Sequence, residues 1–428
     1  MLKTFAAGAA LFAAALGAQT VTLSNVRLID GTGRPAVEHA TIQISNGKIA
    51  SIVAVNTKTP AKQTVIPGLI NAHGHVGLVK GASVSPANYT GLNIMHQLTQ
   101  YERYGVTTTV SLGLNKDLLY KIRADQGKGN EPGATVLTAS RGIGVPNGMP
   151  PVKVGSDQLY RPKTAEAARA AVREMAAHSP NLIKIWVDDG LGKYPKMLPE
   201  AYEAVIDEAH RANLKVAAHV YYLSDAKSLV QHGVDILAHS IRDRELDAET
   251  VSLLKSKNVF YIPTLQLEES FYVYGGQPEW MNTPFFKTAV TPKQMELLNS
   301  EAKATGLDVH RKAFETAMAN AKKLHTATVS MGMGTDSGAN PYRIQGFAEH
   351  RELELMVEAG FSPLEAIHAA TQVNAKMLGI EDKTGTVEKG KQADMVILDA
   401  NPLDDIRDTR KISAVYHRGR KVEPKLQD

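Results

Sequence analysis

One stretch decides the fold: Val65-Ile66-Pro67-Gly68-Leu69-Ile70-Asn71-Ala72-His73-Gly74-His75. Its apolar and β-branched residues predict a strand, and the strand ends in a His-x-His pair. Residues two apart in a strand face the same side, so His73 and His75 can offer two imidazoles to one point. Imidazole is a common ligand of zinc and similar ions. A single pair of this kind also occurs by chance, so its meaning depends on the rest of the chain.

The sequence around this stretch alternates between strand-like and helix-like segments. The strand-like segments are Val65–His75, Val106–Leu112, Ala134–Arg141, Leu182–Asp188, Leu214–Val220, Val234–Ser240, Val259–Leu265 and Thr328–Asp336, and the helix-like ones include Ala165–His178, Pro199–Ala212, Ser224–Gln231 and Ala248–Ser256. This α/β alternation over about 300 residues predicts a parallel (β/α)8 TIM barrel. An open doubly wound sheet is the alternative, but it would need a G-x-G-x-x-G loop after an early strand, which the sequence lacks there.

Short strand-like segments also lie near both ends of the chain. They are Val21–Leu28, Ala40–Ser45 and Lys48–Val53 before the barrel, and Gly385–Gly390, Ala393–Leu398 and Ile412–Val422 after it. We therefore expect residues 19–63 and 384–428 to form one small composite β-sandwich domain, with the barrel in residues 64–383.

The first 18 residues have the pattern of a signal peptide. Lys3 precedes the apolar run Phe5–Leu16, and small residues at Ala15, Gly17 and Ala18 suit cleavage. The run is short for a membrane span. We expect an exported protein, periplasmic or secreted, without a stable membrane anchor.

Composition excludes some kinds of site. Lys plus Arg number 48 against 44 for Asp plus Glu, and no basic cluster stands out, so we expect no nucleic-acid partner. The chain has no cysteine, so any metal must be held by His, Asp, Glu or a modified Lys. The absence of cysteine also fits an oxidising compartment.

Several metal-competent residues fall within or at the ends of predicted strands. They are His73, His75, Lys184, His219, His239 and Asp336. Singly, each has a structural alternative: a buried lysine paired with Asp188 or Asp189, satisfied core histidines, or a turn-forming aspartate. Because the carboxyl ends of barrel strands meet at one face, the six together predict a metal site. The remaining histidines lie in helical or peripheral stretches and are expected to be structural: His39, His96, His178, His210, His232, His310, His325, His350, His368 and His417.

These residues, the opening stretch and the tail Gly385-Thr386-Val387-Glu388-Lys389-Gly390-Lys391-Gln392-Ala393-Asp394-Met395-Val396-Ile397-Leu398 resemble the amidohydrolase superfamily over nearly the whole mature chain. Ile183-Lys184-Ile185 and His219-Val220-Tyr221 resemble its imidazolonepropionase-like and Xaa-Pro dipeptidase-like branch. The resemblance implies two divalent metal ions, with His73, His75 and Asp336 at the first and His219 and His239 at the second. It also implies a carboxylated Lys184 that bridges them. Zinc is the first candidate, followed by manganese, cobalt and iron.

The resemblance implies an enzyme, a metal-dependent hydrolase of carbon–nitrogen bonds. Metal-activated hydroxide would cleave an amide of a small carboxylate-bearing molecule, such as a dipeptide, an N-acyl amino acid or a cyclic amide. Asp336 would act as general base and then general acid. Tyr221 would either donate to the carbonyl oxygen or oxyanion, or form part of the pocket wall. Arg141 and Arg242 are candidate partners of a substrate carboxylate, and the alternative for each is a surface or structural role. Members of this kind often assemble, so we expect a homo-oligomer.

Some alternatives remain open. Dipeptidase members often have glycine-rich turns where this chain has Ala139–Gly144 and Asp188-Asp189-Gly190, which counts against a dipeptide substrate. The second hypothesis is a mononuclear imidazolonepropionase-like hydrolase of a cyclic amide or amidine, with Lys184 uncarboxylated. The third is a metal-binding scaffold without turnover. The long, aromatic-containing segment from Gln266 to Arg311 is either a lid or a packing segment.

Overall fold

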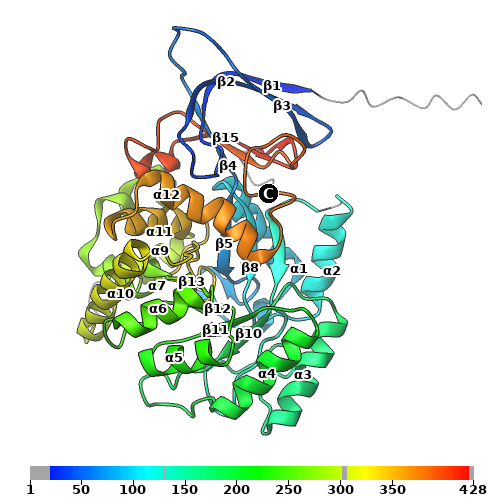
Figure 1. Cartoon of the computed structure of the whole chain (residues 1–428), viewed down its shortest axis with the longest axis vertical. Helices are drawn as coiled ribbons and strands as arrows, with labels where there is room; N and C mark the ends of the chain where they lie inside the picture. Colours follow the sequence, from blue (N-terminus) through cyan, green and yellow to red (C-terminus); the bar gives the residue numbers. More distant parts are fainter. Residues whose placement is uncertain (1–19, 130, 301–305, 424–428) are drawn as a thin grey trace, which may run out of the picture.

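The computed structural model describes residues 20–129, 131–300 and 306–423, which form two parts (Figure 1). A seven-stranded sheet lies at one end of the molecule, above a larger part in which helices surround parallel strands. The predicted α/β class is confirmed. The predicted signal peptide at residues 1–18 lies outside the described residues. Within the ranges that are described, none of the helices combines the length and the apolar character that crossing a membrane requires.

Both ends of the chain contribute to the seven-stranded sheet. Its strands, in spatial order, are β16 (Arg420–Lys421), β15 (Ile412–His417), β14 (Met395–Leu398), β4 (Thr64–Pro67), β1 (Val21–Leu28), β2 (Val37–Ser45) and β3 (Lys48–Ala54). The two ends meet where β4 pairs antiparallel with β14, beside a buried apolar cluster that contains Ile42 and Ile397. The segment Gly385–Gly390, expected to be a strand, forms turns. The sandwich arrangement and the domain division at residues 63 and 64 stay predictions, because the described strands form one continuous sheet that includes β4.

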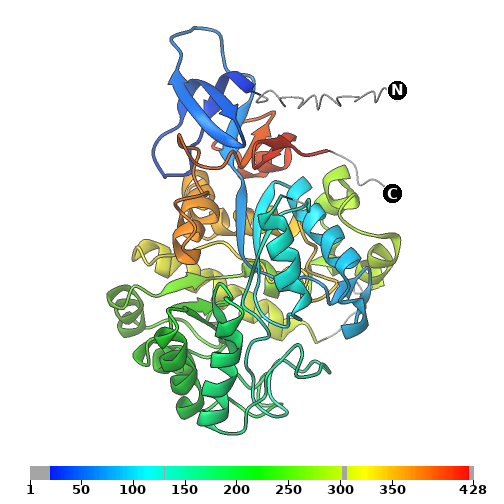
Figure 2. The same cartoon turned by 90° about the vertical axis from the view of Figure 1, so that its right-hand side faces the viewer.

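The opening stretch joins the two parts of the molecule. It is divided at Gly68 into β4 and β5 (Leu69–Gly74), and Figure 2 shows this segment running from the upper sheet down into the helical part. A Cβ at position 68 would lie 2.2 Å from the hydroxyl oxygen of Thr107. Glycine is therefore required at this position by the close approach of the neighbouring strand.

The larger part is built around parallel strands. β5, β8 (Val106–Ser111) and β9 (Thr135–Thr138) form one sheet, and β10 (Ile183–Trp186), β11 (Val216–His219), β12 (Ile236–Ala238) and β13 (Phe260–Ile262) form another. Isolated parallel bridges connect these sheets to neighbouring segments. Ile143, after β9, pairs with Ile185 of β10; Tyr261 of β13 pairs with Met331; and Gly74 of β5 pairs with Ser337. The carboxyl ends of β5, β11 and β12 therefore lie on one face.

The eighth predicted strand, Thr328–Asp336, is not a regular strand. It makes one bridge, at Met331, and the Asn374 side chain then inserts beside it. The Asn374 amide donates to the carbonyl oxygens of Ile70 and Met333 at 2.6 and 2.7 Å. A Cβ on Gly332 would lie 2.1 Å from the Asn374 side chain. Side-chain hydrogen bonds thus replace part of the backbone ladder. The local sequence of residues 328–336 gives no sign of this interruption.

Helices cover the outside of these strands, and their positions follow the predicted ones closely. The described helices and remaining short elements are β6 (Val79–Lys80), β7 (Ser83–Val84), η1 (Pro86–Asn88), α1 (Gly91–Arg103), α2 (Leu118–Gly127), α3 (Ala165–Ala177), α4 (Pro199–Arg211), α5 (Leu223–Gln231), α6 (Ala248–Ser256), α10 (Asp308–Thr326), α11 (Phe347–Glu358), α12 (Pro363–His368), η5 (Ala369–Val373), α13 (Asn374–Leu378) and η6 (Ile406–Arg410). Apolar residues on α3, α4 and α5 pack into the largest buried cluster, as their amphipathic sequences predict.

The segment after β13 is folded into short helices. They are α7 (Leu265–Glu269), η2 (Val273–Gly276), η3 (Glu279–Asn282), α8 (Pro284–Lys287) and α9 (Pro292–Ser300). Its aromatic residues mostly pack among themselves and on α11: the Trp280 and Phe286 rings lie 4.7 and 4.8 Å from that of Phe347. Phe271 is different, because it lines the cavity described below. The packing interpretation therefore holds for Trp280 and Phe286, while a role of this segment as a lid stays a prediction.

Candidate metal centre

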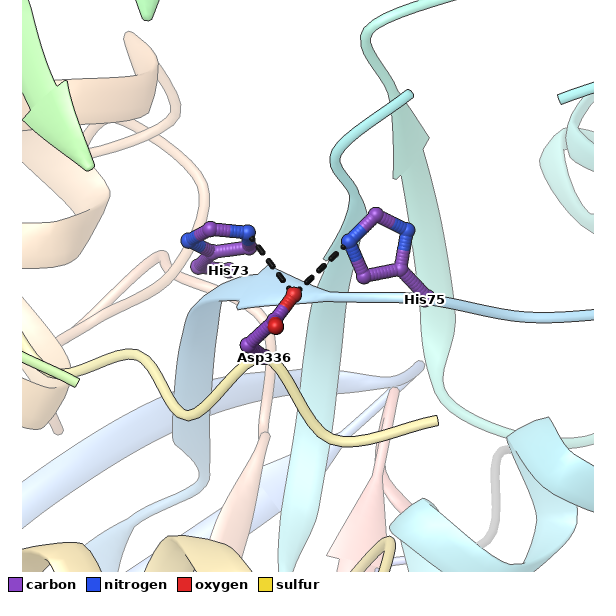
Figure 3. A group of neighbouring side chains, drawn as sticks. All are labelled: His73, His75 and Asp336. Atoms are coloured by element: carbon purple, nitrogen blue, oxygen red, sulfur yellow. Dashed lines mark ion pairs between the residues drawn. The ribbon is translucent and has the colours of Figure 1, made fainter. Parts of the chain in front are cut away.

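Three predicted ligands lie together where β5 ends. Oδ1 of Asp336 lies 3.1 Å from Nε2 of His73 and 2.9 Å from Nε2 of His75 (Figure 3). These ligand atoms form a group that could hold one metal ion. Asp336 has a backbone φ of 57°, a strained conformation for most residues but one that aspartate tolerates. The backbone amide of Asp336 donates to the carbonyl oxygen of His73, which fixes the carboxylate beside the His-x-His pair.

His219 and His239 extend the group across the strand ends. The His239 ring lies 4.5 Å from the His73 ring and 4.4 Å from the His219 ring, measured between centroids. Nδ1 of His239 contacts Oγ1 of Thr264 at 2.9 Å, which leaves Nε2 for a ligand. Nε2 of His219 lies 2.5 Å from Oδ2 of Asp188. His239 and Thr264 both have positive φ angles, a backbone conformation that is unfavourable for these two residue types.

Lys184 is buried beneath these histidines. Its side chain has no exposed surface, and Nζ makes no hydrogen bond to any residue the structure describes. Burial lowers the pKa of Lys184 to about 7. The expected alternative, a lysine hydrogen-bonded to Asp188 or Asp189, is not seen, since Asp188 is bound to His219 and Asp189 accepts from Tyr222.

The donor set fits a metal. Burial lowers the pKa of His73 and His239 well below the usual value and also lowers that of His219, so these imidazoles are uncharged, as metal ligands must be. Burial raises the pKa of Asp336, but the Arg343 guanidinium and His73 outweigh it and hold that pKa well below its usual range. Nδ1 of His73, Nδ1 of His75 and Nζ of Lys184 are buried polar atoms without a described hydrogen-bond partner. Unpaired buried donors and acceptors destabilise a fold, and their presence together here is explained if the cluster binds a metal.

A buried carboxylate behind the centre aligns the segments that carry the ligands. Glu349 of α11 accepts from Asn71, Thr335 and Ser337 at 2.7 Å each through Oε1. Its Oε2 accepts from the backbone amide of Gly346. Because Asn71 precedes His73 and Thr335 precedes Asp336, Glu349 ties the two ligand-bearing segments together.

Replacing Glu349 by alanine is expected to destabilise the protein by about 3–5 kcal/mol, since four buried donors lose their acceptor. Glu349→Gln keeps one oxygen and should cost clearly less. Chemical denaturation of both variants measures the two values. Equal and small losses in both would show that Glu349 does not hold the segments.

A cavity of about 300 Å³ opens above the centre. Of the predicted substrate contacts, Tyr221 and Arg242 line it, with the Arg242 guanidinium 4.6 Å from the centre of the Tyr221 ring. Arg141 is not among its lining residues. Its guanidinium is bound to Asp117 and Glu174 at 3.0 and 3.1 Å, so the structure does not bring it to the site.

Sequence reasoning missed several residues of the site. Asp188 follows a strand end, so its position carried a usable signal. Arg343 contacts Asp336 from a loop, and its ring-stacking partner Phe271 belongs to the segment after β13. His310, expected to be structural, lines the cavity and contacts Glu268 at 2.9 Å. These loop and helix positions have no strand-end pattern that could have revealed them.

Comparison with known proteins places this geometry in a family. A sequence model described as "Amidohydrolase family" matches residues 64–422. Ochratoxinase from Aspergillus niger is 26% identical over 434 aligned positions, which cover 91% of this chain and 83% of that protein. The crystal structure of a putative prolidase from Bifidobacterium longum superimposes with a TM-score of 0.76 at 27% identity, covering 96% of each chain. A Xaa-Pro dipeptidase with bound methionine shares the fold with a TM-score of 0.75 at 23% identity, over 95% of this chain and all of that one.

Proposed function

Since this chain belongs to the amidohydrolase family of hydrolases that act on carbon–nitrogen bonds, we propose that it is a binuclear metallohydrolase of a small, carboxylate-bearing amide. The observation that carries this proposal is Lys184, a fully buried amine without a described hydrogen-bond partner. It lies within electrostatic range of Asp336 and of three of the predicted ligand histidines, His73, His219 and His239. A pKa of about 7 leaves much of its amine uncharged, which is the form that can take up CO2.

The residues divide into two ligand groups. His73, His75 and Asp336 would hold one divalent ion, with zinc as the first candidate. His219 and His239 would hold a second, and a carboxylated Lys184 would join the two. When bound, these ions would supply a hydroxide nucleophile at neutral pH and polarise the substrate carbonyl.

The chain's own groups manage protons and orientation. Asp336 takes the proton of the attacking water and returns it to the leaving nitrogen, a role that suits a carboxylate ionised at neutral pH. Burial raises the pKa of Tyr221, so its hydroxyl stays protonated and can donate to the carbonyl oxygen or oxyanion. Arg242 would hold a substrate carboxylate.

The same proposal includes export through the 1–18 segment to the periplasm or the medium, and assembly into a homo-oligomer. It includes neither a membrane anchor nor a nucleic-acid partner. Fractionation of cells that express the full chain tests export. Light scattering of the purified protein tests assembly.

Hydrolysis tests the central activity. Purified protein loaded with zinc and bicarbonate is expected to cleave some of a panel of dipeptides, N-acyl amino acids, lactams and imides, and to lose this activity on chelation. Failure on the whole panel would contradict the proposal. Full activity with one tightly held metal would instead favour the mononuclear hydrolase of cyclic amides or amidines.

A further inference from the structure

A second buried carboxyl group of α11 lies behind the metal centre. Glu352 has no exposed surface and follows Glu349 by about one helical turn. Its Oε1 accepts from the backbone amide of Leu265 at 2.8 Å, and its Oε2 accepts from that of Gln266 at 2.7 Å. Both donors belong to the first turn of α7, which lies against α11 (Figure 1). Glu352 therefore holds α7 by its N-terminal end.

Helix α7 depends on this acceptor from another helix. The first amides of a helix have no partner within it, and the side chain of the N-cap residue usually accepts from one of them. The N-cap residue of α7 is Thr264, whose hydroxyl makes no such hydrogen bond. That hydroxyl instead contacts Nδ1 of His239 at 2.9 Å. Because Glu352 caps the helix, the Thr264 side chain is left for the histidine.

The backbone at Thr264 is strained. Its φ of 45° and ψ of 52° are left-handed, a conformation that is unfavourable for a β-branched residue. Such a conformation persists only where the surrounding structure fixes it. On one side, the backbone amide of Ser240 donates to the carbonyl oxygen of Pro263 at 3.0 Å. On the other side, Glu352 holds the first turn of α7, so its loss would let the turn relax and move the Thr264 hydroxyl away from His239.

The Thr264 hydroxyl determines which nitrogen of His239 can bind a metal. Burial holds the pKa of His239 well below its usual value, so the ring is neutral and carries one proton. When Oγ1 of Thr264 accepts from Nδ1, that proton stays on Nδ1 and the lone pair is on Nε2. Without this partner the proton could lie on either nitrogen and the ring could rotate, and both changes weaken metal binding.

We propose that Glu352 is a positioning residue for the second metal ion: it holds the turn at Thr264, which fixes the orientation and the tautomer of His239. This inference rests on the proposed function, because that function assigns His239 to the second ion. One face of α11 then supports the whole centre. Glu349 ties together the segments that carry ligands of the first ion, and Glu352 acts on a ligand of the second.

The ionisation of Glu352 gives this role a dependence on pH. Burial raises the pKa of Glu352 to about 8, opposed by the backbone amides of Gln266 and Leu265 and assisted by the carboxyl groups of Glu269 and Glu349. Above this pKa both oxygens are strong acceptors, whereas the neutral carboxyl group has one, as glutamine does. Glu352→Gln should therefore differ from the wild type more at about pH 9 than at about pH 7.

Zinc affinity tests the proposal. Competition with a chromophoric chelator, above the pKa of Glu352 and with bicarbonate present, measures the zinc dissociation constants. We expect Glu352→Gln to weaken one zinc site roughly 10-fold or more and to leave the other unchanged. Glu102→Gln is the matched control, because Glu102 is also a buried helical residue that accepts from a backbone amide, that of Gly133, and it does not line the cavity. This control should leave both affinities unchanged.

Two outcomes separate the inference from the function on which it rests. Two zinc sites of wild-type affinity in Glu352→Gln would overturn the inference and leave the proposed function standing. A single zinc site in the wild-type protein would contradict both.

A double-mutant cycle tests the route through Thr264. Thr264→Val removes the hydroxyl and keeps the shape of the side chain, so it should weaken the same zinc site. If Glu352 acts through this hydroxyl, adding Glu352→Gln to Thr264→Val weakens the site no further. Additive losses of affinity would contradict the route.

Metal-free protein gives a readout that does not depend on zinc. In NMR spectra of protein with isotope-labelled histidine, the hydrogen bond to Thr264 should slow the exchange of the Nδ1 proton of His239 with water. Loss of this signal in Thr264→Val assigns it. We expect the signal to be lost in Glu352→Gln and kept in Glu102→Gln. Its retention in Glu352→Gln would overturn the inference, whatever the number of metal ions.

Discussion

Replacing Asp336 by asparagine is expected to lower kcat by about 10²- to 10⁴-fold, because the variant loses the group that accepts and returns the proton. The same carboxylate contacts both imidazoles of the His-x-His pair and the Arg343 guanidinium. Asparagine is the informative substitution, since it tolerates the φ of 57° at this position, whereas alanine would add backbone strain.

Steady-state kinetics, elemental analysis and thermal melting of Asp336→Asn separate the possible effects. Asp189→Asn is a matched control, because Asp189 lies on a neighbouring loop, accepts from Tyr222 and does not line the cavity. Lost activity with metal retained would exclude a metal-binding scaffold without turnover. Wild-type activity in Asp336→Asn would remove the proton-transfer role assigned to this residue.

Lys184→Met is expected to abolish most activity and yet to stabilise the metal-free protein by about 1–3 kcal/mol. Methionine has a similar length and removes a buried amine that has no hydrogen-bond partner in the described structure. Denaturation of chelator-treated wild type and variant measures this difference. A destabilised variant would mean that Lys184 has a structural partner, which would argue against an amine that is free to be carboxylated.

The stabilisation should depend on pH. The pKa of Lys184 is about 7 in the folded protein and 10.5 in an ordinary environment. Between these values the unfolded wild type holds more protons than the folded form, so its free energy of unfolding rises with pH, by at most ~1.4 kcal/mol per unit. Lys184→Met lacks this group. The difference in free energy of unfolding between the variant and the wild type should therefore shrink as pH rises from about 7 towards 10. A constant difference across that range would contradict the lowered pKa.

The parts of the fold predicted from sequence were those fixed by local pattern. Period-two alternation predicted that His73, in β5, and His75, just after it, converge on one point, as their contacts with Asp336 show. An apolar run predicted that Lys184 lies inside β10, where it is fully buried. Strand-end position then brought His219 and His239 to the same face, as their ring contacts show. The family resemblance read from these residues is confirmed by the match over residues 64–422.

The parts that were missed depend on contacts between distant segments. The eighth strand is interrupted because Asn374 reaches across from α13, some 40 residues further along the chain. Arg141 follows a strand as a site residue would, yet two carboxylates hold it away from the cavity. Arg343 and His310 reach the site from a loop and a helix, and their role depends on Asp336, Phe271 and Glu268 rather than on their neighbours in sequence.

Metal content per chain tests the central claim most directly. Wild-type protein and Lys184→Met, both prepared with zinc and bicarbonate, are compared by elemental analysis. The binuclear account predicts two metal ions per wild-type chain and one or none in the variant. One ion per chain in both proteins would contradict it, would make Lys184 a structural lysine, and would direct the search towards substrates with imidazolone-like rings.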